Sequence, residues 1–272
     1  MSLEETKQLL RTYRIYPNKL LGQNFMVETS LYPKLCNYAA LESSDVVLDA
    51  GAGLGFLARF LSDKCESVIA VEKDRQVAEV LREQTKEIRK VTVIEGDVLK
   101  VALPNFNKVI AIPPYYLSSH LVTWLLERKI DCAVLILQKE FSVRLLAPIA
   151  SKEYGWLTVV TNQHSEVQLL DAVPKEVFYP QPEVDSVILS LKPWSIEPFK
   201  VKDAAFFKQM VKWLFTQRNK KIGKALSPFL KTTLKLSKEE AEKLARNLPF
   251  HDRRARELAP KNFGELANAI HN

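Results

Sequence analysis

The chain has 272 residues, of which 47% are hydrophobic and 26% are charged, a composition typical of a globular protein and not of a disordered one. Its formal net charge is +7, and its three cysteines are scattered with no CxxC pair, which argues against a disulfide framework and indicates a reducing, cytoplasmic location. No apolar run reaches membrane-spanning length, and the charged N-terminus has no signal-peptide core, so we expect no membrane association.

The first part of the chain alternates short apolar runs with amphipathic stretches. Helices are predicted for 56–61, 75–86 and 119–127. Such alternation is typical of βαβ units with a parallel sheet, so the sequence predicts an α/β, Rossmann-like domain over residues 1–193. The predicted strands are 46–50, 67–71, 91–94, 108–111, 132–137, 167–170 and 184–191.

The pattern changes at Lys192–Ser195, and beyond it we predict only helices, so residues 194–272 form a small all-α domain. Ser237 and Glu240 have the spacing of a capping box, and Pro260 suits a helix start. This region holds 17 Lys and Arg against 8 Asp and Glu. The excess indicates either a binding surface for a polyanion or a solvated helical face. The predicted helices are 206–215, 220–230, 238–247 and 260–270.

A glycine-rich loop, Gly51–Gly55, closes the first predicted strand. Its spacing differs from the dinucleotide fingerprint, but its glycines allow a tight turn and the close approach of a ligand. Glu72 ends the second strand, where a carboxylate can accept both hydroxyls of a ribose. Asp97 ends the third strand and can accept from an adenine amino group, although alone it also fits a turn or cap. We predict a nucleoside site and no metal site.

The tetrapeptide Ile112-Pro113-Pro114-Tyr115 follows the fourth predicted strand. In this order, after a glycine loop and two acidic strand ends, the tetrapeptide is typical of enzymes that methylate an exocyclic amine. These enzymes normally carry Asn or Asp where this chain has Ile112. The amine nitrogen must be oriented by hydrogen-bond acceptors, so a missing acceptor is expected to cost roughly 10²–10³ in rate.

These motifs belong to an ordered series of blocks along nearly the whole chain. The series resembles the ribosomal RNA small-subunit adenine N6,N6-dimethyltransferase family, of the KsgA type. The residues within the motifs resemble those of archaeal members. The resemblance implies a class I S-adenosylmethionine-dependent methyltransferase fold followed by a small helical domain. The other blocks are Asn18–Met26, Gln138–Phe141, Arg144–Leu145, Tyr154–Leu157, Phe178–Ser186, Arg218–Lys221, Ala225–Leu226, Glu257–Pro260 and Leu266–Ala269.

The resemblance also implies roles for cofactor residues. Asn24 and Met26 are expected at the methionine end of S-adenosyl-L-methionine or in the cap over it. Gly51 passes closest to the cofactor, Glu72 holds the ribose and Asp97 the adenine. Ile112 is expected to border both the cofactor and the target base.

Three residues are expected at the target adenosine. Pro113 offers its carbonyl to the amine, Tyr115 stacks on the base and Phe178 is the second aromatic beside it. The basic residues expected to contact RNA phosphates are Arg218, Lys220, Lys221 and Lys224, with a second cluster at Arg253, Arg254 and Arg256. The aromatic residues expected in the core are Trp156, Trp194, Trp213, Phe206 and Phe207.

The implied activity is methyl transfer to N6 of two adjacent adenosines near the 3′ end of small-subunit ribosomal RNA, by a monomer acting on the assembling particle. Ile112 leaves three explanations open: a slow enzyme, including one that stops after one methyl group, a methylation-deficient assembly factor that binds RNA, or an engineered change. A nucleic-acid-binding transcription factor and a DNA amine methyltransferase are further alternatives. The missing targeting segment argues against the first of these, and the C-terminal blocks favour ribosomal RNA over DNA.

Overall fold

A computed structural model describes residues 2–18 and 22–270. The chain forms two compact units, each made of two segments. Unit 1 comprises Met1–Ser142 and Gln168–Pro193, and unit 2 comprises Val143–Val167 and Trp194–Asn272. No helix of the described residues is long and apolar enough to cross a membrane.

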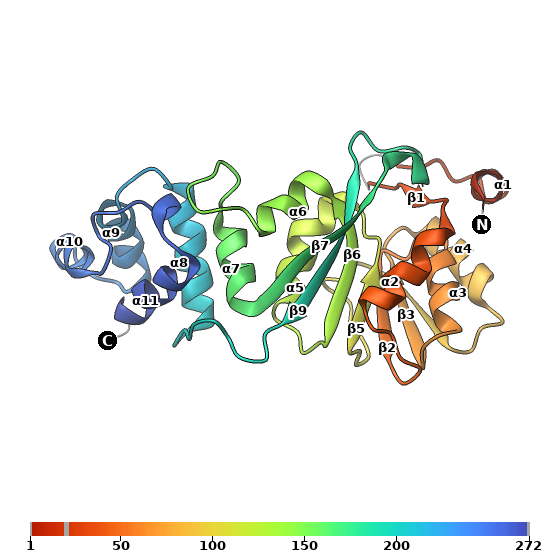
Figure 1. Cartoon of the computed structure of the whole chain (residues 1–272), viewed down its shortest axis with the longest axis horizontal. Coiled ribbons are helices and arrows are strands. Elements are labelled where there is room, and N and C mark those ends of the chain that lie inside the picture. The colour runs from red at the N-terminus through yellow and green to blue at the C-terminus, as the bar shows by residue number, and fades with distance from the viewer. Residues whose placement is uncertain (1, 19–21, 271–272) are drawn as a thin grey trace. The chain divides into compact units, whose positions relative to one another are not determined.

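Unit 1 is built on a seven-stranded sheet with the order β4-β3-β2-β5-β6-β9-β7 (Figure 1). The pairs β2–β3, β3–β4, β2–β5 and β5–β6 are parallel, whereas β9 is antiparallel to β6. The carboxyl ends of β2 to β5 therefore lie at one edge. The bounds are β2 (Val46–Ala50), β3 (Ser67–Glu72), β4 (Val91–Glu95), β5 (Lys108–Ala111), β6 (Cys132–Gln138), β7 (Ser165–Val173) and β9 (Ser186–Pro193).

The strand sequences match their positions in the sheet. Strand β6 is an almost continuous apolar run, and six of its seven residues are buried, as expected for a central strand covered on both faces. Strand β4 lies at the edge of the sheet and has no fully buried residue. A two-stranded antiparallel ladder joins β1 (Phe25–Met26) to β8 (Phe178–Tyr179).

Helices of unit 1 cover the sheet with apolar faces. Helix α3 packs on β2, β3 and β4, and α4 packs on β3 and β4. Asp74 caps α4 by accepting the backbone N–H groups of Gln76 and Val77, at 2.9 and 3.3 Å. The helices are α1 (Leu3–Thr12), α2 (Tyr32–Tyr38), α3 (Phe56–Ser62), α4 (Arg75–Thr85), α5 (Ser118–Leu125) and α6 (Lys139–Leu145), whose last three residues belong to unit 2.

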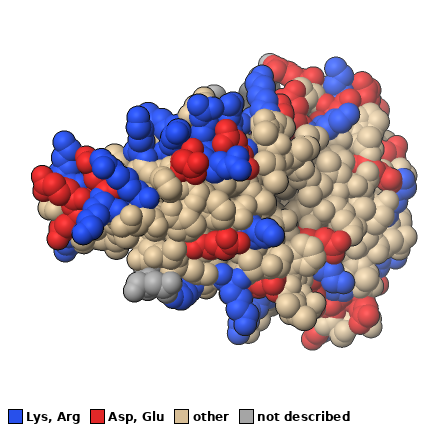
Figure 2. Space-filling model, turned by 60° about the vertical axis from the view of Figure 1, so that its left-hand side comes forward, with Lys and Arg blue, Asp and Glu red and all other residues tan. Residues whose placement is uncertain are grey.

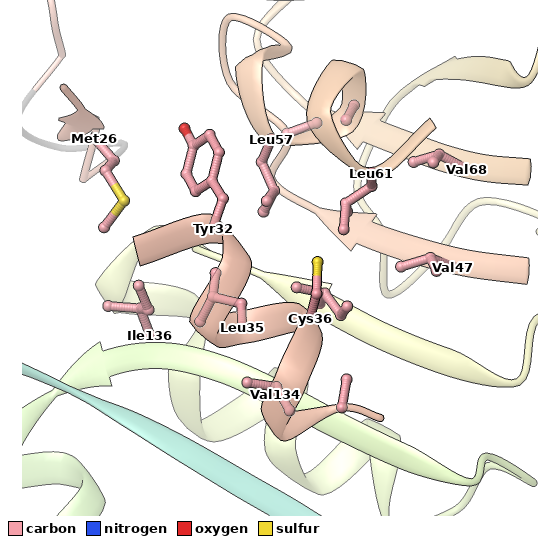
Figure 3. Close-up of a cluster of buried hydrophobic side chains, with 14 of the residues drawn as sticks. Met26, Tyr32, Leu35, Cys36, Val47, Leu57, Leu61, Val68, Val134 and Ile136 are labelled. Carbon is pink, nitrogen blue, oxygen red and sulfur yellow. The ribbon is translucent and has the colours of Figure 1, made fainter. Parts of the chain in front are cut away.

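One buried apolar cluster ties α2 to the sheet and to the ladder (Figure 3). Leu35 and Cys36 of α2 lie over Val134 and Ile136 of β6. All four side chains are less than 10% exposed, so they hold α2 on the sheet through the hydrophobic effect. Met26 of β1, Leu57 and Leu61 of α3 and Phe178 of β8 join the same cluster.

Unit 2 is entirely helical apart from the first residues of β7. Helix α7 packs against α8 and α11, and α9 packs against α8 and α10. Phe206 and Phe207 are buried, as predicted, while the three tryptophans expected in the core are only partly buried. The predicted capping box of Ser237 and Glu240 is present, at 3.2 and 2.8 Å. The helices are α7 (Trp156–His164), α8 (Ala204–Thr216), α9 (Ile222–Thr233), α10 (Lys238–Asn247) and α11 (Pro260–Ile270).

The division of the chain differs from the single boundary expected near residue 194. Val143–Val167 groups with the C-terminal helices, because α7 packs against α8 and α11. The hydroxyl of the buried Tyr154 donates to the carbonyl of Leu258 at 2.7 Å, and Arg218 donates to the carbonyls of Ser151 and Lys152, each at 2.9 Å. These contacts span 66 to 104 residues of sequence, beyond the reach of local patterns.

Substitution of Tyr154 tests this grouping. Tyr154→Phe leaves the Leu258 carbonyl without its donor, so we expect it to lower the free energy of unfolding by about 1–3 kcal/mol. Denaturant unfolding measures the change. Tyr16→Phe is the matched control, since Tyr16 is 88% exposed. Equal stability of the two variants would contradict a structural role for the Tyr154 hydroxyl.

Candidate active site

A cleft opens where the parallel strands of unit 1 end, the place where ligands bind in open α/β sheets. The loops after four strands line it. They contribute Gly51 after β2, Glu72 at the end of β3, Asp97 after β4 and Ile112 after β5. Within the described residues, no group of His, Cys, Asp and Glu side chains is arranged to hold a metal ion.

Glu72 lies buried at the centre of the cleft wall. Its Oε2 accepts from the backbone N–H of Gly53 at 2.9 Å, and its Oε1 accepts from Lys73 and Asp74 at 2.8 and 2.9 Å. Burial raises the pKa of the carboxyl, although these three hydrogen bonds oppose the rise. Glu72 therefore ties the glycine loop to the start of α4 and still faces the cleft.

Asp97 stands in the cleft as predicted, and it is also a turn residue. Its Oδ1 accepts the backbone N–H of Leu99 at 3.1 Å, and its Oδ2 forms an ion pair with Lys73 at 3.3 Å. The side chains of the pair are 22% and 51% exposed. A ligand amine that reaches Asp97 therefore meets a carboxylate already positioned by its own loop.

Gly51 makes the closest approach between the loops after β2 and β5. Its φ is +81°, a conformation that favours glycine, and a Cβ at this position would lie 2.6 Å from Cδ of Pro114. Any larger residue would push these two loops apart. The glycine is therefore required here for packing between loops as well as for ligand approach.

Asp49 lies two residues before Gly51 and had no predicted role. It is 1% exposed, lies in a second pocket that adjoins the cleft, and its Oδ2 has no hydrogen-bond partner. Burial, reinforced by the Glu72 carboxylate, raises the pKa of Asp49 to about 8. An unpaired buried carboxyl of this kind is suited to receive a cationic ligand group. An acidic residue at the end of a buried strand was the feature of the sequence that could have indicated a functional role for Asp49.

The segment before β1 forms one side of both pockets. Asn24 lines the cleft and the second pocket, and its Nδ2 donates to the carbonyl of Gly22 at 3.2 Å. Gln23 anchors the segment by donating to Asp74 at 2.9 Å. Met26 lines only the second pocket, not the cleft. Part of the motif that predicted this segment, residues 19–21, lies outside the described residues.

Two aromatic side chains face each other where the target base was predicted. The rings of Tyr115 and Phe178 lie 6.5 Å apart and nearly perpendicular, at 74°. The Tyr115 hydroxyl shares a 2.6 Å hydrogen bond with the fully buried Ser186 of β9. Burial raises the pKa of the Tyr115 hydroxyl above its ordinary value. Ser186 belongs to the family-like segment Phe178–Ser186, but no role was predicted for it. Its hydrogen bond fixes the orientation of the Tyr115 ring.

Ile112 lines both pockets and packs its side chain against the apolar cluster that includes Phe178 and Met26. It adds no polar side-chain atom to the cleft. Pro113, which follows it, also lines the cleft. Ile112 thus lines the cleft and the second pocket, and its side chain forms part of their apolar wall.

In unit 2 the two basic clusters predicted to contact RNA are joined by backbone pairing. Lys221 and Arg254 form an isolated antiparallel bridge, and Ile222 donates to the carbonyl of Arg253 at 2.7 Å. Lys220, Lys221 and Lys224 are exposed, whereas Arg218 is engaged with backbone carbonyls. On the face drawn in Figure 2, Lys and Arg side chains gather in groups with Asp and Glu beside them.

The two pockets fit the parts of S-adenosylmethionine, the cofactor implied by the sequence resemblance. The cleft offers acidic side chains for a nucleoside, Glu72 and Asp97, beside Gly51, where a Cβ would collide with the Pro114 ring. The second pocket offers the unpaired Asp49 oxygen for the ammonium of an amino acid. The donors and acceptors thus match a ligand with a nucleoside at one end and an amino acid at the other.

Comparisons with known proteins agree with this site. Residues 16–257 match the family model described as "Ribosomal RNA adenine dimethylase". The chain is 35% identical over 266 residues to a "Probable ribosomal RNA small subunit methyltransferase A" of Methanosarcina mazei, covering 97% of this chain and 96% of the relative. It is 34% identical to a "Ribosomal RNA small subunit methyltransferase A" of Halothermothrix orenii, covering 97% and 92%.

Two solved structures have similar folds. A dimethyladenosine transferase from Plasmodium falciparum gives a TM-score of 0.76 at 24% identity, covering 91% of this chain and 97% of that one, and this likeness concerns the fold alone. The 23S rRNA methyltransferase ErmE gives a TM-score of 0.64 at 25% identity, covering 92% and 100%. The predicted α/β methyltransferase fold is confirmed.

The hydrogen bond between Tyr115 and Ser186 is open to a double-mutant cycle. We expect Tyr115→Phe and Ser186→Ala each to destabilise the protein, and the double variant to lose about 0.5–1.5 kcal/mol less than the sum of the two. Urea denaturation measures all four proteins. Strictly additive losses would mean that the two hydroxyls do not interact.

Proposed function

The chain belongs to the ribosomal RNA adenine dimethylase family, and we propose that it transfers methyl groups from S-adenosylmethionine to N6 of two adjacent adenosines near the 3′ end of small-subunit ribosomal RNA. The observation that carries this proposal is that the expected cofactor site and the expected site of the target base adjoin at Gly51 and Ile112. One cleft is lined both by the acidic side chains of Glu72 and Asp97 and by the aromatic rings of Tyr115 and Phe178, which meet edge to face.

On the cofactor side, the residues of this chain bind and orient S-adenosylmethionine. Glu72 is suited to accept a ribose hydroxyl, because its three backbone hydrogen bonds leave one of about four carboxylate acceptor positions free. Asp97 is suited to accept the adenine amine, and Asp49 to pair with the ammonium of the methionine end. S-adenosylmethionine supplies a methyl group that its positively charged sulfur makes electrophilic.

On the target side, the chain must remove a base from RNA structure and hold its amine in line with that methyl group. Tyr115 offers a ring face for stacking, worth about 1–3 kcal/mol in comparable sites, and Ser186 keeps the ring in place. The backbone carbonyl of Pro113 is the acceptor expected for one amine N–H. Phe178 is 3% exposed and meets the Tyr115 ring edge to face, so it supports the ring on which the base is expected to stack. Catalysis by this site is mainly positioning.

RNA recognition is assigned to charge and shape. The exposed Lys220, Lys221 and Lys224 are suited to phosphate contacts, which orient RNA without reading its sequence. Arg218 contributes by holding residues 151 and 152 in unit 2. Action on the assembling small subunit, a monomeric state and a cytoplasmic location are parts of the same proposal.

A second candidate function is an RNA-binding assembly factor with little or no methylation. Ile112 favours it, because the side chain at this position cannot accept a hydrogen bond from the target amine. The unpaired Asp49 oxygen and the hydrogen-bonded Glu72 favour the enzyme. A protein without cofactor chemistry has no need of a buried carboxyl whose pKa is raised to about 8.

Methyl transfer to small ribosomal subunits that lack these methyl groups decides between the two functions. With S-adenosylmethionine labelled in its methyl group, we expect label in N6-methylated adenosine of the small-subunit RNA. Tyr115→Ala is expected to lower the rate about tenfold or more, since it removes the stacking face. Tyr16→Ala serves as the control on an exposed tyrosine. Failure of the wild-type protein to label adenosine would favour the assembly factor.

Proton release tests the role given to Asp49. At pH 7 its carboxyl is mostly protonated in the free protein, because its pKa is about 8. A cation bound beside it lowers that pKa, so S-adenosylmethionine binding is expected to release close to one proton at pH 7 and progressively less above pH 8. Calorimetry in buffers of different ionisation enthalpy measures this release.

Asp49→Asn should abolish the release and weaken binding about tenfold or more, since a charged partner is lost. Asp63→Asn, at an exposed helix end, is the matched control. Binding by the wild-type chain without proton release would contradict the assignment of Asp49.

A further inference from the structure

Besides Asp49, the second pocket contains another buried polar side chain that lacks a partner. Tyr32 of α2 is 3% exposed and lines this pocket, and within the described residues its hydroxyl forms no hydrogen bond. In Figure 3 the hydroxyl points away from α2, and Met26 and Leu57 lie on either side of the ring. Both of these residues line the second pocket as well. The ring is thus part of the pocket wall, with its polar end still available.

The hydroxyl of Tyr32 lies on the Asp49 side of its ring. Burial, and after it the Asp49 carboxylate, raises the pKa of the Tyr32 hydroxyl, so the two groups are close enough to interact electrostatically. Tyr32 also borders a surface cavity beside α1, but Asp49 does not line that cavity. The influence of Asp49 therefore places the hydroxyl at the second pocket and not at the surface cavity.

The two unpaired groups define the ligand that would satisfy both. Burying a polar group without a partner costs free energy, and a ligand that pairs with it recovers this cost. The Asp49 carboxyl suits a cation, and the Tyr32 hydroxyl offers a hydrogen-bond donor to an anion. An α-amino acid carries an ammonium and a carboxylate on one carbon atom, and S-adenosylmethionine has such a group at one end. No Lys or Arg of the described residues lines the pocket, so this carboxylate needs uncharged donors.

Most other donors around the pocket already have acceptors within the protein. The backbone N–H groups of Gly51, Ala52 and Gly53 all donate to protein oxygens, at 2.8, 3.0 and 2.9 Å. The side-chain amide of Asn24 donates one N–H to a backbone carbonyl at 3.2 Å. Among the described side chains of this pocket, Tyr32 is therefore the donor whose hydrogen-bonding capacity is entirely unused.

We propose that Tyr32 determines specificity at the cofactor site, where its hydroxyl donates a hydrogen bond to the carboxylate of S-adenosylmethionine while Asp49 pairs with the ammonium. This inference rests on the proposed function, which assigns the amino-acid end of the cofactor to the second pocket. The pair Tyr32 and Asp49 then selects a complete amino acid over an amine alone. A hydrogen bond to a charged group is expected to change the dissociation constant by about tenfold or more.

Calorimetry with the full chain and two ligands tests this role. The first ligand is S-adenosylmethionine, and the second is decarboxylated S-adenosylmethionine, which keeps the nucleoside, the sulfonium and the ammonium but has no carboxylate. Tyr32→Phe is expected to weaken binding of the first ligand about tenfold or more, because it removes the donor. It should leave the affinity for the decarboxylated ligand unchanged. A purely structural effect of the substitution would weaken both ligands equally.

Two further measurements control for the fold. Tyr32→Phe removes a hydroxyl that has no partner in the free protein, so urea unfolding should find it at least as stable as the wild type. Tyr38→Phe is the matched control, because Tyr38 belongs to the same helix, is 36% exposed and lines neither pocket. It should keep both affinities.

Equal weakening of both ligands by Tyr32→Phe, or an unchanged affinity for S-adenosylmethionine in the folded variant, would overturn the proposal. If the variant does not fold, the wild-type chain decides, since a preference for S-adenosylmethionine over the decarboxylated ligand of less than about tenfold also overturns it. Failure of the proposed function looks different: adenosine of the small-subunit RNA would stay unlabelled while both ligand affinities follow the expected pattern.

Discussion

The contact between Gly51 and Pro114 is the constraint on which the rest of the site depends. Strands β2 and β5 are neighbours in the sheet, so the loops that follow them must pass one another at its edge. They pass so closely that a Cβ on residue 51 would lie 2.6 Å from the Pro114 ring. The cleft beside this contact is lined by Glu72 and Asp97 and also by Tyr115 and Phe178, so the proposed cofactor and base sites adjoin, as transfer between two ligands requires.

The two sides of this meeting point use different interactions. On the cofactor side, carboxylates dominate: Glu72 is held by three backbone amides and Asp49 is buried without a partner. On the target side, the described wall is mostly apolar, and Tyr115 is oriented through its hydroxyl by Ser186. Ile112 belongs to the apolar side. Its presence agrees with a site that holds the target amine mainly through backbone and packing contacts.

Local sequence patterns predicted the elements whose structure is determined by residues that are close together in the sequence. Apolar runs and the glycine loop predicted strands β2 to β6 and the positions of Glu72 and Asp97, because the carboxyl ends of parallel strands converge. The tie between Tyr115 and Ser186 spans 71 residues, and the grouping of 143–167 with the C-terminal helices depends on similar long-range contacts. No spacing rule reaches that far, so only the folded structure reveals them.

The central claim is that cofactor and target base meet at Gly51 and Ile112. A crystal structure of the chain with S-adenosylhomocysteine, the product left after methyl transfer, tests it most directly. The account predicts the ligand's ribose at Glu72, its adenine near Asp97 and its sulfur at the junction beside Gly51 and Ile112. A ligand bound away from this junction, or one whose amino group lies far from Asp49, would contradict the account.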